Sequence, residues 1–340
     1  MDKSGASSYV YAKACGLYAR SFVGPRTKKL FEVKRLQDLW TLLFDDDVPL
    51  VPEGMLALLL ERKSEEHAVN EFITLLSVYD KPDPLSIALL SLYDYNNLKS
   101  ASSSIALGKS NAPFMVDIGN FAIFDKTKWP DLAAMTQNTS VSWYNRLPEI
   151  SEQVEWETHL DHAYYHSLWS AVCSLDRSDR LATENLVREE IILQNIIWAM
   201  RLRVYYNKTA EEIIPLLAGS SEGPKVSRIL SQSAIDILDK PVDFWENWSD
   251  WKYSWLLNPH EEGVPWNLDP RWAQLAADKY IYRQAMRQFH SNPFTVGVLV
   301  CFFKIKQLEE HMIRVAAEGL RLGATESQMN EFIGGGPGDV

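Results

Sequence analysis

The sequence is poor in cysteine and has no long apolar run. Its three cysteines, Cys15, Cys173 and Cys301, lie far apart and form no CxxC pair, which argues against a disulfide framework and a zinc ribbon. The longest apolar run, at 296–303, is far shorter than the roughly 20 residues of a membrane-spanning helix. The N-terminus lacks the apolar segment of a signal peptide. We therefore expect a cytoplasmic protein with no direct membrane span.

Positive charge is also scarce. The 340 residues include 34 Lys and Arg against 45 Asp and Glu, for a formal net charge of −11. A protein that binds nucleic acid needs clustered Lys and Arg to neutralise phosphates, so we expect no nucleic-acid partner. The hydrophobic content of 46% is enough for a sizeable core, in one large domain or in two to three smaller modules.

Strand patterns are nearly absent as well. Only 113–124 has partial strand character, as a short hairpin or an ordered loop. Asp83–Pro84 and Asn292–Pro293 each pair an N-cap residue with a proline suited to the first helical position, and Gly323 is suited to end the last helix. The fold class is therefore predicted to be all-α. Apart from the helices that these signals bound, helices are predicted at 5–20, 34–44, 53–78, 152–175, 184–206, 226–238 and 270–289.

Clusters of Gly, Pro and polar residues divide the chain into three parts. Two of these parts share a pattern, because Asn195 and His311 are each followed fourteen residues later by a capping box, at 209–212 and at 325–328. This similarity predicts three related helical modules. Their ranges are 1–148, 149–238 and 239–333, followed by a flexible tail at 334–340.

The first module offers a weaker match to this pattern. Asn96 and Lys99 have the same spacing as His311 and Arg314, but no capping box follows them. Together with Asn195, these polar residues are candidates for contact with a partner. The alternative is that they satisfy backbone groups where modules meet.

Three short motifs are compatible with catalysis or metal binding, but each has a simpler structural interpretation. The GKS at 108–110 lacks the earlier glycine of a phosphate-binding loop, since Ser103 stands there. His162 and His166 could share a helix face as metal ligands, yet that helix needs the same region for packing. The acidic run at 45–47 lacks DDxxD spacing. No catalytic, cofactor-binding or metal-binding residue is predicted, and no cofactor is expected.

Tryptophan is concentrated at 244–255, FWENWSDWKYSW, where four indoles occur at steps of three, three and four. This spacing predicts a helical stripe that packs mainly in the core, the alternative being an exposed surface for a protein partner. We expect Trp266 and Trp272 to be the exposed members of this region, and they are further candidates for partner contact.

Three segments together resemble a known family. They are DYNNLK at 94–99, EWETHLDHAYY at 155–165 and, most specifically, NPFTVGVLVCFFKIKQLEEHMIRVAAEGLRLG at 292–323. The chain resembles the central-stalk C subunit of prokaryotic V-type (A-type) rotary ATPases, which is called the d subunit in eukaryotes. It departs from the family pattern at His311, where an Asn is usual, at Trp198, where a basic residue is usual, and in its long Trp-rich segment at 244–272.

The resemblance implies an all-α funnel of three similar modules about a pseudo-threefold axis, with no catalytic site of its own. It also implies a position on the cytoplasmic face of the membrane, between the D–F rotor axle and the proteolipid ring. Such a protein passes torque during ATP-driven H⁺ or Na⁺ transport, or during ATP synthesis. Two alternatives stay open, a helical scaffold that binds another partner through its Trp-rich segment and a diphosphate-using enzyme at 45–47.

Overall fold

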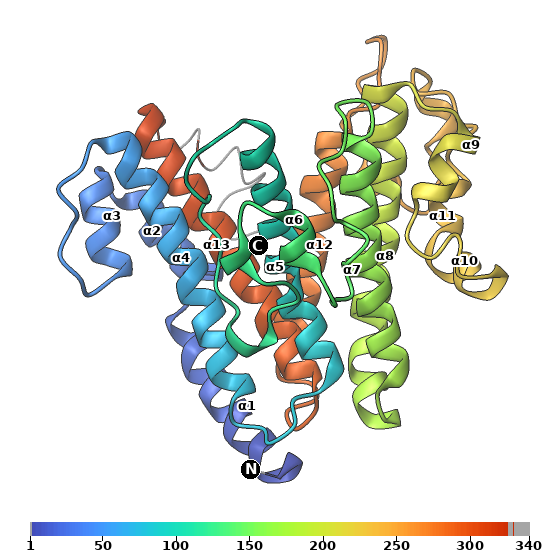
Figure 1. Ribbon diagram of the computed structural model, residues 1–340. Coiled ribbons are helices and arrows are strands. Elements are labelled where there is room, and N and C mark those ends of the chain that lie inside the picture. The colour runs from blue at the N-terminus through green and yellow to red at the C-terminus, as the bar shows by residue number, and fades with distance from the viewer. Residues whose placement is uncertain (1, 326–328, 330–340) are drawn as a thin grey trace. The chain divides into compact units, whose positions relative to one another are not determined.

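The computed structural model describes residues 2–325 and residue 329 (Figure 1). The regular elements in this part of the chain are α-helices and short 3-10 helices, without a strand, which confirms the predicted all-α class. No described helix has the length and apolar character needed to cross a membrane. The expected capping box at 325–328 and the expected flexible tail at 334–340 involve residues outside the described part.

The chain divides into two compact units, one formed by Met1–Leu147 with Ala285–Val340 and the other by Pro148–Gln284. Residues 239–284 thus group with the second unit, and the division into three similar modules stays a prediction. The first unit contains α1 (Lys3–Arg20), α2 (Lys28–Glu32), α3 (Leu36–Leu43), α4 (Glu53–Leu76), α5 (Pro84–Ala106), α6 (Leu132–Thr136) and α13 (Gly297–Leu322). The second unit contains α7 (Gln153–Ser174), α8 (Arg177–Tyr206), α9 (Ala210–Ile213), α10 (Pro224–Leu230), α11 (Gln232–Ile235) and most of α12 (Pro270–Gln288).

Helix α13 forms the core of the first unit. It lies along α4 and also contacts α1, α2, α3 and α5 (Figure 1). Its first two turns are buried on almost every side because the sequence at 297–303 is apolar. The ring of Phe303 meets those of Phe72 on α4 and Tyr93 on α5 edge-on, with centroid distances of 5.1 and 6.0 Å. This geometry is the favourable arrangement for aromatic pairs.

Helix α8 organises the second unit. It packs against α7 on one side and also contacts the short helices α10 and α11 (Figure 1). Asp176 caps its N-terminus by accepting a hydrogen bond from the backbone N–H of Asp179. Asn207 ends it in the left-handed conformation, with φ of 50°. With 30 residues, α8 spans about 45 Å and is the longest described helix of this unit.

Most predicted helix boundaries are confirmed, with three corrections. Helix α8 begins at Arg177 rather than at 184, and the predicted helix at 226–238 is divided into the short helices α10 and α11. Asp83 caps α5, its carboxylate accepting from the backbone N–H of Ser86 at 2.8 Å. Gly323 ends α13 with φ of 69°. The third correction concerns the last helix. The predicted start at Asn292–Pro293 was wrong, because α13 begins at Gly297. The carbonyl of Asn292 instead accepts hydrogen bonds from the backbone N–H and the hydroxyl of Thr295, which close a separate turn.

The Trp-rich segment at 244–255 is not the predicted helical stripe. The backbone N–H groups of Trp248, Trp251 and Ser254 each bond the carbonyl three residues earlier, so the segment is a chain of short turns that includes two 3-10 helices, Trp245–Asn247 and Ser254–Leu256. The step of three in the tryptophans matches these turns rather than the 3.6-residue period of an α-helix. Aromatic residues also favour α-helix less than Ala and Leu do.

The expected exposure of the tryptophans is only partly correct. Trp248 is fully buried, as expected for packing, and Trp272 is 47% exposed, also as expected. Trp266 was expected to be exposed but is 6% exposed, because its ring packs against Trp245 and Trp248. Trp255, expected to pack, is 43% exposed. The interior of the segment is therefore a small aromatic core, with further rings at its surface.

Candidate functional site

Asn195 on α8 holds the backbone of the segment that follows its helix. Its amide nitrogen donates to the carbonyls of Ala218 and Leu230, both at 2.9 Å, and its amide oxygen accepts from the N–H of Ala218 at 2.8 Å. The side chain is completely buried. The structure therefore favours the structural interpretation of this candidate residue, in which it satisfies backbone groups, over contact with a partner.

The same device occurs on α5, but at Asn97 rather than at the predicted Asn96. The amide of Asn97 donates to the carbonyl of Val116 at 2.8 Å and accepts from its N–H at 2.9 Å. Asn96 is exposed. The helical period does not distinguish the two, since Asn96 and Asn97 each lie seven positions after a buried leucine, Leu89 and Leu90.

Asp94 completes this arrangement and orders the 113–124 segment as a loop. One carboxylate oxygen accepts from the amide of Asn97 at 3.0 Å, and the other accepts from the N–H of Ile123 at 2.7 Å. Burial raises the pKa of Asp94 to about 6, although both hydrogen bonds oppose the shift. Of the two forms left open by the sequence, hairpin and ordered loop, the structure shows the loop.

The remaining candidate contact residues of the first unit lie on α5 and α13. His311 and Arg314 lie on α13, where Arg314 is 56% exposed and its Nε is 3.7 Å from the carboxylate of Glu61. Burial, followed by the nearby charge of Arg314, lowers the pKa of His311. Lys99 is partly buried on α5. Within the first unit, Arg314 is therefore the candidate whose charge is most accessible to a partner.

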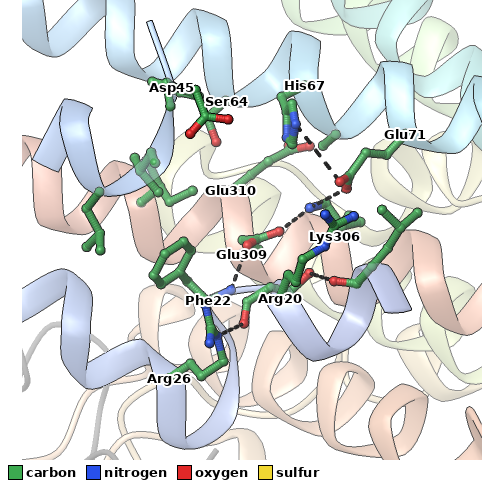
Figure 2. Close-up of a pocket in the computed structure, with 17 residues that line it drawn as sticks. Arg20, Phe22, Arg26, Asp45, Ser64, His67, Glu71, Lys306, Glu309 and Glu310 are labelled. Atoms are coloured by element: carbon green, nitrogen blue, oxygen red, sulfur yellow. Dashed lines mark hydrogen bonds and ion pairs between the residues drawn. The ribbon is translucent and has the colours of Figure 1, made fainter. Parts of the chain in front are cut away.

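A cavity of about 320 Å³ lies in the first unit beside α13 (Figure 2). Its wall combines the end of α1 and the turn after it, the segment that joins α3 to α4, and the facing sides of α4 and α13. The side chains that line it are rich in charge, and two of the charged ones, Lys306 and Glu309, are buried. The charged and titratable ones are Arg20, Arg26, Asp45, His67, Glu71, Lys306, Glu309 and Glu310.

Lys306 is at the centre of the charge network in this cavity. Its Nζ is 2.7 Å from Oε2 of Glu71 and also contacts Oε2 of Glu309, while its side chain is only 7% exposed. Oε1 of Glu309 accepts from the backbone N–H of Phe22 at 2.6 Å, which ties α13 to the end of α1 (Figure 2). Burial alone would lower the pKa of Lys306, but the carboxylates of Glu309 and Glu71 outweigh it, so the pKa is raised and the ammonium is retained.

Glu310, the next residue on α13, is in a different environment. The hydroxyl of Tyr93 donates to its Oε1 at 2.8 Å. Burial raises the pKa of Glu310 to about 8, against the effect of the Tyr93 hydrogen bond and with a further rise from the charge of Glu65. Glu310 is thus largely protonated at neutral pH, whereas its neighbour Glu309 is held in an ion pair.

Replacement of Glu310 by Gln should make the stability of the protein less dependent on pH. The pKa of about 8 in the folded state is above the ordinary 4.5, so stability falls as pH rises between these values, by at most about 1.4 kcal/mol per pH unit. We expect the Glu310→Gln variant to gain stability over the parent on going from pH 5 to pH 8. Urea unfolding at the two pH values measures this gain.

The adjacent Glu309→Gln variant is the matched control for that experiment. It removes charge from the contact with Lys306, so we expect it to be less stable than the parent at both pH values. An equal response of the two variants to pH would contradict the assignment of the raised pKa to Glu310.

The sequence motifs weighed for catalysis lie in ordinary structural settings. Gly108–Ser110 forms an exposed turn after α5, not a loop that opens a helix. His162 Nε2 lies 2.9 Å from the carbonyl of Leu217, and His166 Nδ1 lies 2.7 Å from Glu222. Asp46 contacts Lys63. Within the part of the chain that the structure describes, no group of three metal-ligating side chains converges.

Sequence reasoning did not identify the charge network of α13. The residues KIKQLEE at 304–310 were interpreted only as part of a family motif. A signal was present, since the helix is apolar on all sides just before them and a helix of that kind is buried. Charged residues that continue such a helix must find partners inside the fold.

Comparisons with known proteins identify the family. The ATP synthase (C/AC39) subunit family matches residues 53–332. An uncharacterized protein of Treponema pallidum (strain Nichols) is 35% identical over 338 residues, which cover 98% of each chain. The C subunit of an A-type ATP synthase from Thermococcus gammatolerans is 25% identical over 340 residues, which cover 96% of this chain and 89% of the relative.

The family match extends from the start of α4 to beyond the end of α13, so it includes residues of both units and most of the charge network described above. It covers well over half of the chain and confirms the family expected from the three sequence segments. The chain belongs to the ATP synthase (C/AC39) subunit family.

Proposed function

We propose that the protein is a non-catalytic central-stalk component of a V/A-type rotary ATPase. In this role it joins the D–F rotor axle to the proteolipid ring on the cytoplasmic side of the membrane. It passes torque between them during ATP-driven H⁺ or Na⁺ transport, or during ATP synthesis. The observation that carries the proposal is membership of the family along most of the chain, supported by the A-type ATP synthase protein among the relatives.

The construction of the first unit is compatible with this mechanical role. Helices α4 and α13 contain 24 and 26 residues and lie along each other, which corresponds to rods of roughly 36 and 39 Å. The ion pairs of Lys306 link the two helices, and the bond from Phe22 to Glu309 adds the end of α1. A protein that couples two rotor parts needs stiff elements of this kind and broad protein interfaces.

Three similar modules about a pseudo-threefold axis are part of the proposal. Two asparagines, Asn97 on α5 and Asn195 on α8, support this part of the proposal. They are 98 positions apart, and the side-chain amide of each bonds both the N–H and the carbonyl of one later residue. This shared device supports a common origin for the first two modules. In the proposed third module, His311 is the position that corresponds to Asn195.

Binding to rotor components tests the proposal. The purified chain is mixed separately with a D–F subcomplex and with the detergent-solubilised proteolipid ring, and retention is measured by pull-down. We expect the chain to bind both and to have no ATPase activity when isolated. Binding to neither, by a chain that is folded and helical by circular dichroism, would contradict the proposal.

A second function, an adaptor of the same architecture with a different partner, is favoured by one observation. The segment at 244–266 forms its own aromatic core and yet leaves Phe244 and Trp255 57% and 43% exposed. The pull-down separates the two functions, because an adaptor of this kind would leave the axle and the ring unbound.

A further inference from the structure

Part of the Trp-rich segment forms a surface of aromatic rings and exposed carboxylates. The rings of Trp245 and His260 stack at a centroid distance of 5.3 Å with an interplanar angle of 6°, which brings the chain around 245 beside the chain around 260. We call this surface the 243–262 face. Its members are Asp243, Phe244, Trp245, Glu246, His260, Glu261 and Glu262.

A rigid base holds this face in place. Trp248 is fully buried, and its Nε1 donates to the carbonyl of Pro241 at 2.7 Å. Trp266 packs against both Trp245 and Trp248, and the N–H of Leu268 donates to the carbonyl of Val242 at 2.8 Å. These contacts fix the two stretches of chain that carry the face, so its aromatic rings are preorganised for binding.

The face leaves apolar surface in water. Phe244 is 57% exposed and lies next to the partly buried Trp245. Two neighbouring large aromatic side chains at a rigid surface are a frequent feature of protein-binding sites, where such residues supply most of the binding free energy.

The charge around these rings is almost entirely negative. The carboxylates of Asp243, Glu246, Glu261 and Glu262 are all exposed. More widely, the 34 residues at 236–269 include eight acidic residues and two lysines, and so carry −6 of the formal −11 of the whole chain. A tenth of the sequence therefore holds more than half of the net charge, and the four exposed carboxylates give the face a negative potential that favours a cationic partner.

The two lysines of this region are directed to neutral oxygens. The Nζ of Lys240 donates to the carbonyl of Asn247 at 2.6 Å, and the Nζ of Lys252 donates to the hydroxyl of Tyr253 at 3.0 Å. Their two charges are also fewer than the four carboxylates of the face. The carboxylates of the face therefore outnumber the nearby lysines, which leaves negative charge available to a cationic partner.

We propose that the 243–262 face binds a Lys- and Arg-rich amphipathic segment of another protein. Its basic side chains pair with the four carboxylates, and its apolar side chains cover Phe244. Nucleic acid and anionic membranes are repelled by the same charge. The proposal does not rest on the role in a rotary complex, because it concerns a surface that the chain presents by itself.

Two synthetic peptides test this proposal with the full chain. Both have leucines at helical spacing over about 14 residues, and the other positions are Lys in one peptide and Glu in the other. We expect the Lys peptide alone to bind in fluorescence anisotropy, and to bind more weakly as salt is raised from about 50 to about 200 mM. Absence of binding by the Lys peptide, or equal binding by the Glu peptide, would overturn the proposal.

Matched substitutions locate the binding. Phe244→Ser should lower the affinity for the Lys peptide about tenfold. Phe294→Ser changes a residue of the first unit that is 61% exposed and should leave this affinity unchanged. These side chains are exposed, so neither change is expected to unfold the chain. Equal affinities of the two variants would place the peptide elsewhere and overturn the proposal.

A second pair of variants tests the charge. The Asp243→Asn/Glu246→Gln variant should also have a lower affinity for the Lys peptide. A Glu53→Gln/Glu66→Gln variant, which removes charge at exposed positions on α4, should keep the affinity of the parent. Vesicles of neutral phosphatidylcholine complete the test. Binding to these vesicles that is lost in Phe244→Ser, without binding of the Lys peptide, would assign the face to a lipid surface and overturn the proposal.

Discussion

Replacement of Lys306 by Met should destabilise the first unit by about 3–5 kcal/mol, because removing one partner of a buried ion pair leaves the opposite charge uncompensated. In this case two carboxylates, those of Glu71 and Glu309, would lose their shared ammonium group. The methionine side chain has a similar length, so the loss would come from charge more than from packing. Urea unfolding followed by circular dichroism at pH 7 measures the change.

Two further variants distinguish a buried network from ordinary surface charge. Arg314→Met removes a cation from the same helix, but Arg314 is 56% exposed, so we expect a loss of less than about 1 kcal/mol. A Glu71→Gln/Lys306→Met/Glu309→Gln variant removes all three charges and should recover much of the stability lost in Lys306→Met. The account of the cavity would be wrong if Lys306→Met cost no more than Arg314→Met.

Replacement of Trp248 by Ala should destabilise the second unit by about 3–5 kcal/mol, the usual cost of truncating a fully buried Trp. The variant loses the hydrogen bond from Nε1 to the carbonyl of Pro241 and the edge-on contact with Trp251, at a centroid distance of 5.5 Å. Thermal unfolding measures the stability. Hydrogen exchange should show faster exchange of backbone amides across 241–268, because the aromatic core orders that segment.

Trp255→Ala is the control for this effect. Trp255 belongs to the same segment but is 43% exposed, so its truncation should cost much less than that of Trp248 and leave amide exchange at 241–250 unchanged. Equal losses for the two variants would mean that burial at Trp248 does not organise the segment.

Helix positions were predictable wherever the sequence carries a local signal. Asp83 and the proline that follows it determine the start of α5, and Gly323 determines the end of α13 because a left-handed residue is needed there. Signals of this kind depend on neighbouring backbone groups alone. The start of α13 was misplaced because Asn292 and Pro293 satisfy a local turn just as well as a helix cap.

Interactions between distant segments were not predictable in the same way. Choosing Asn97 over Asn96 requires knowing that Val116 passes beside α5, and no local pattern states this. The pairing of Lys306 with Glu71 joins residues 235 positions apart. The aromatic spacing at 244–255 was compatible with two kinds of helical turn, and contacts such as that between Trp248 and Trp266 decided between them.

The most direct measurement of the proposed role is made in a reconstituted rotary complex. The catalytic head, the D–F axle and the ring-containing membrane sector are assembled in vesicles with and without this chain, and ATP hydrolysis and ion transport are recorded together. We predict that ATP-driven transport requires the chain, whereas the head still hydrolyses ATP without it. Transport at the same rate in its absence would contradict the proposal that the chain couples the axle to the ring.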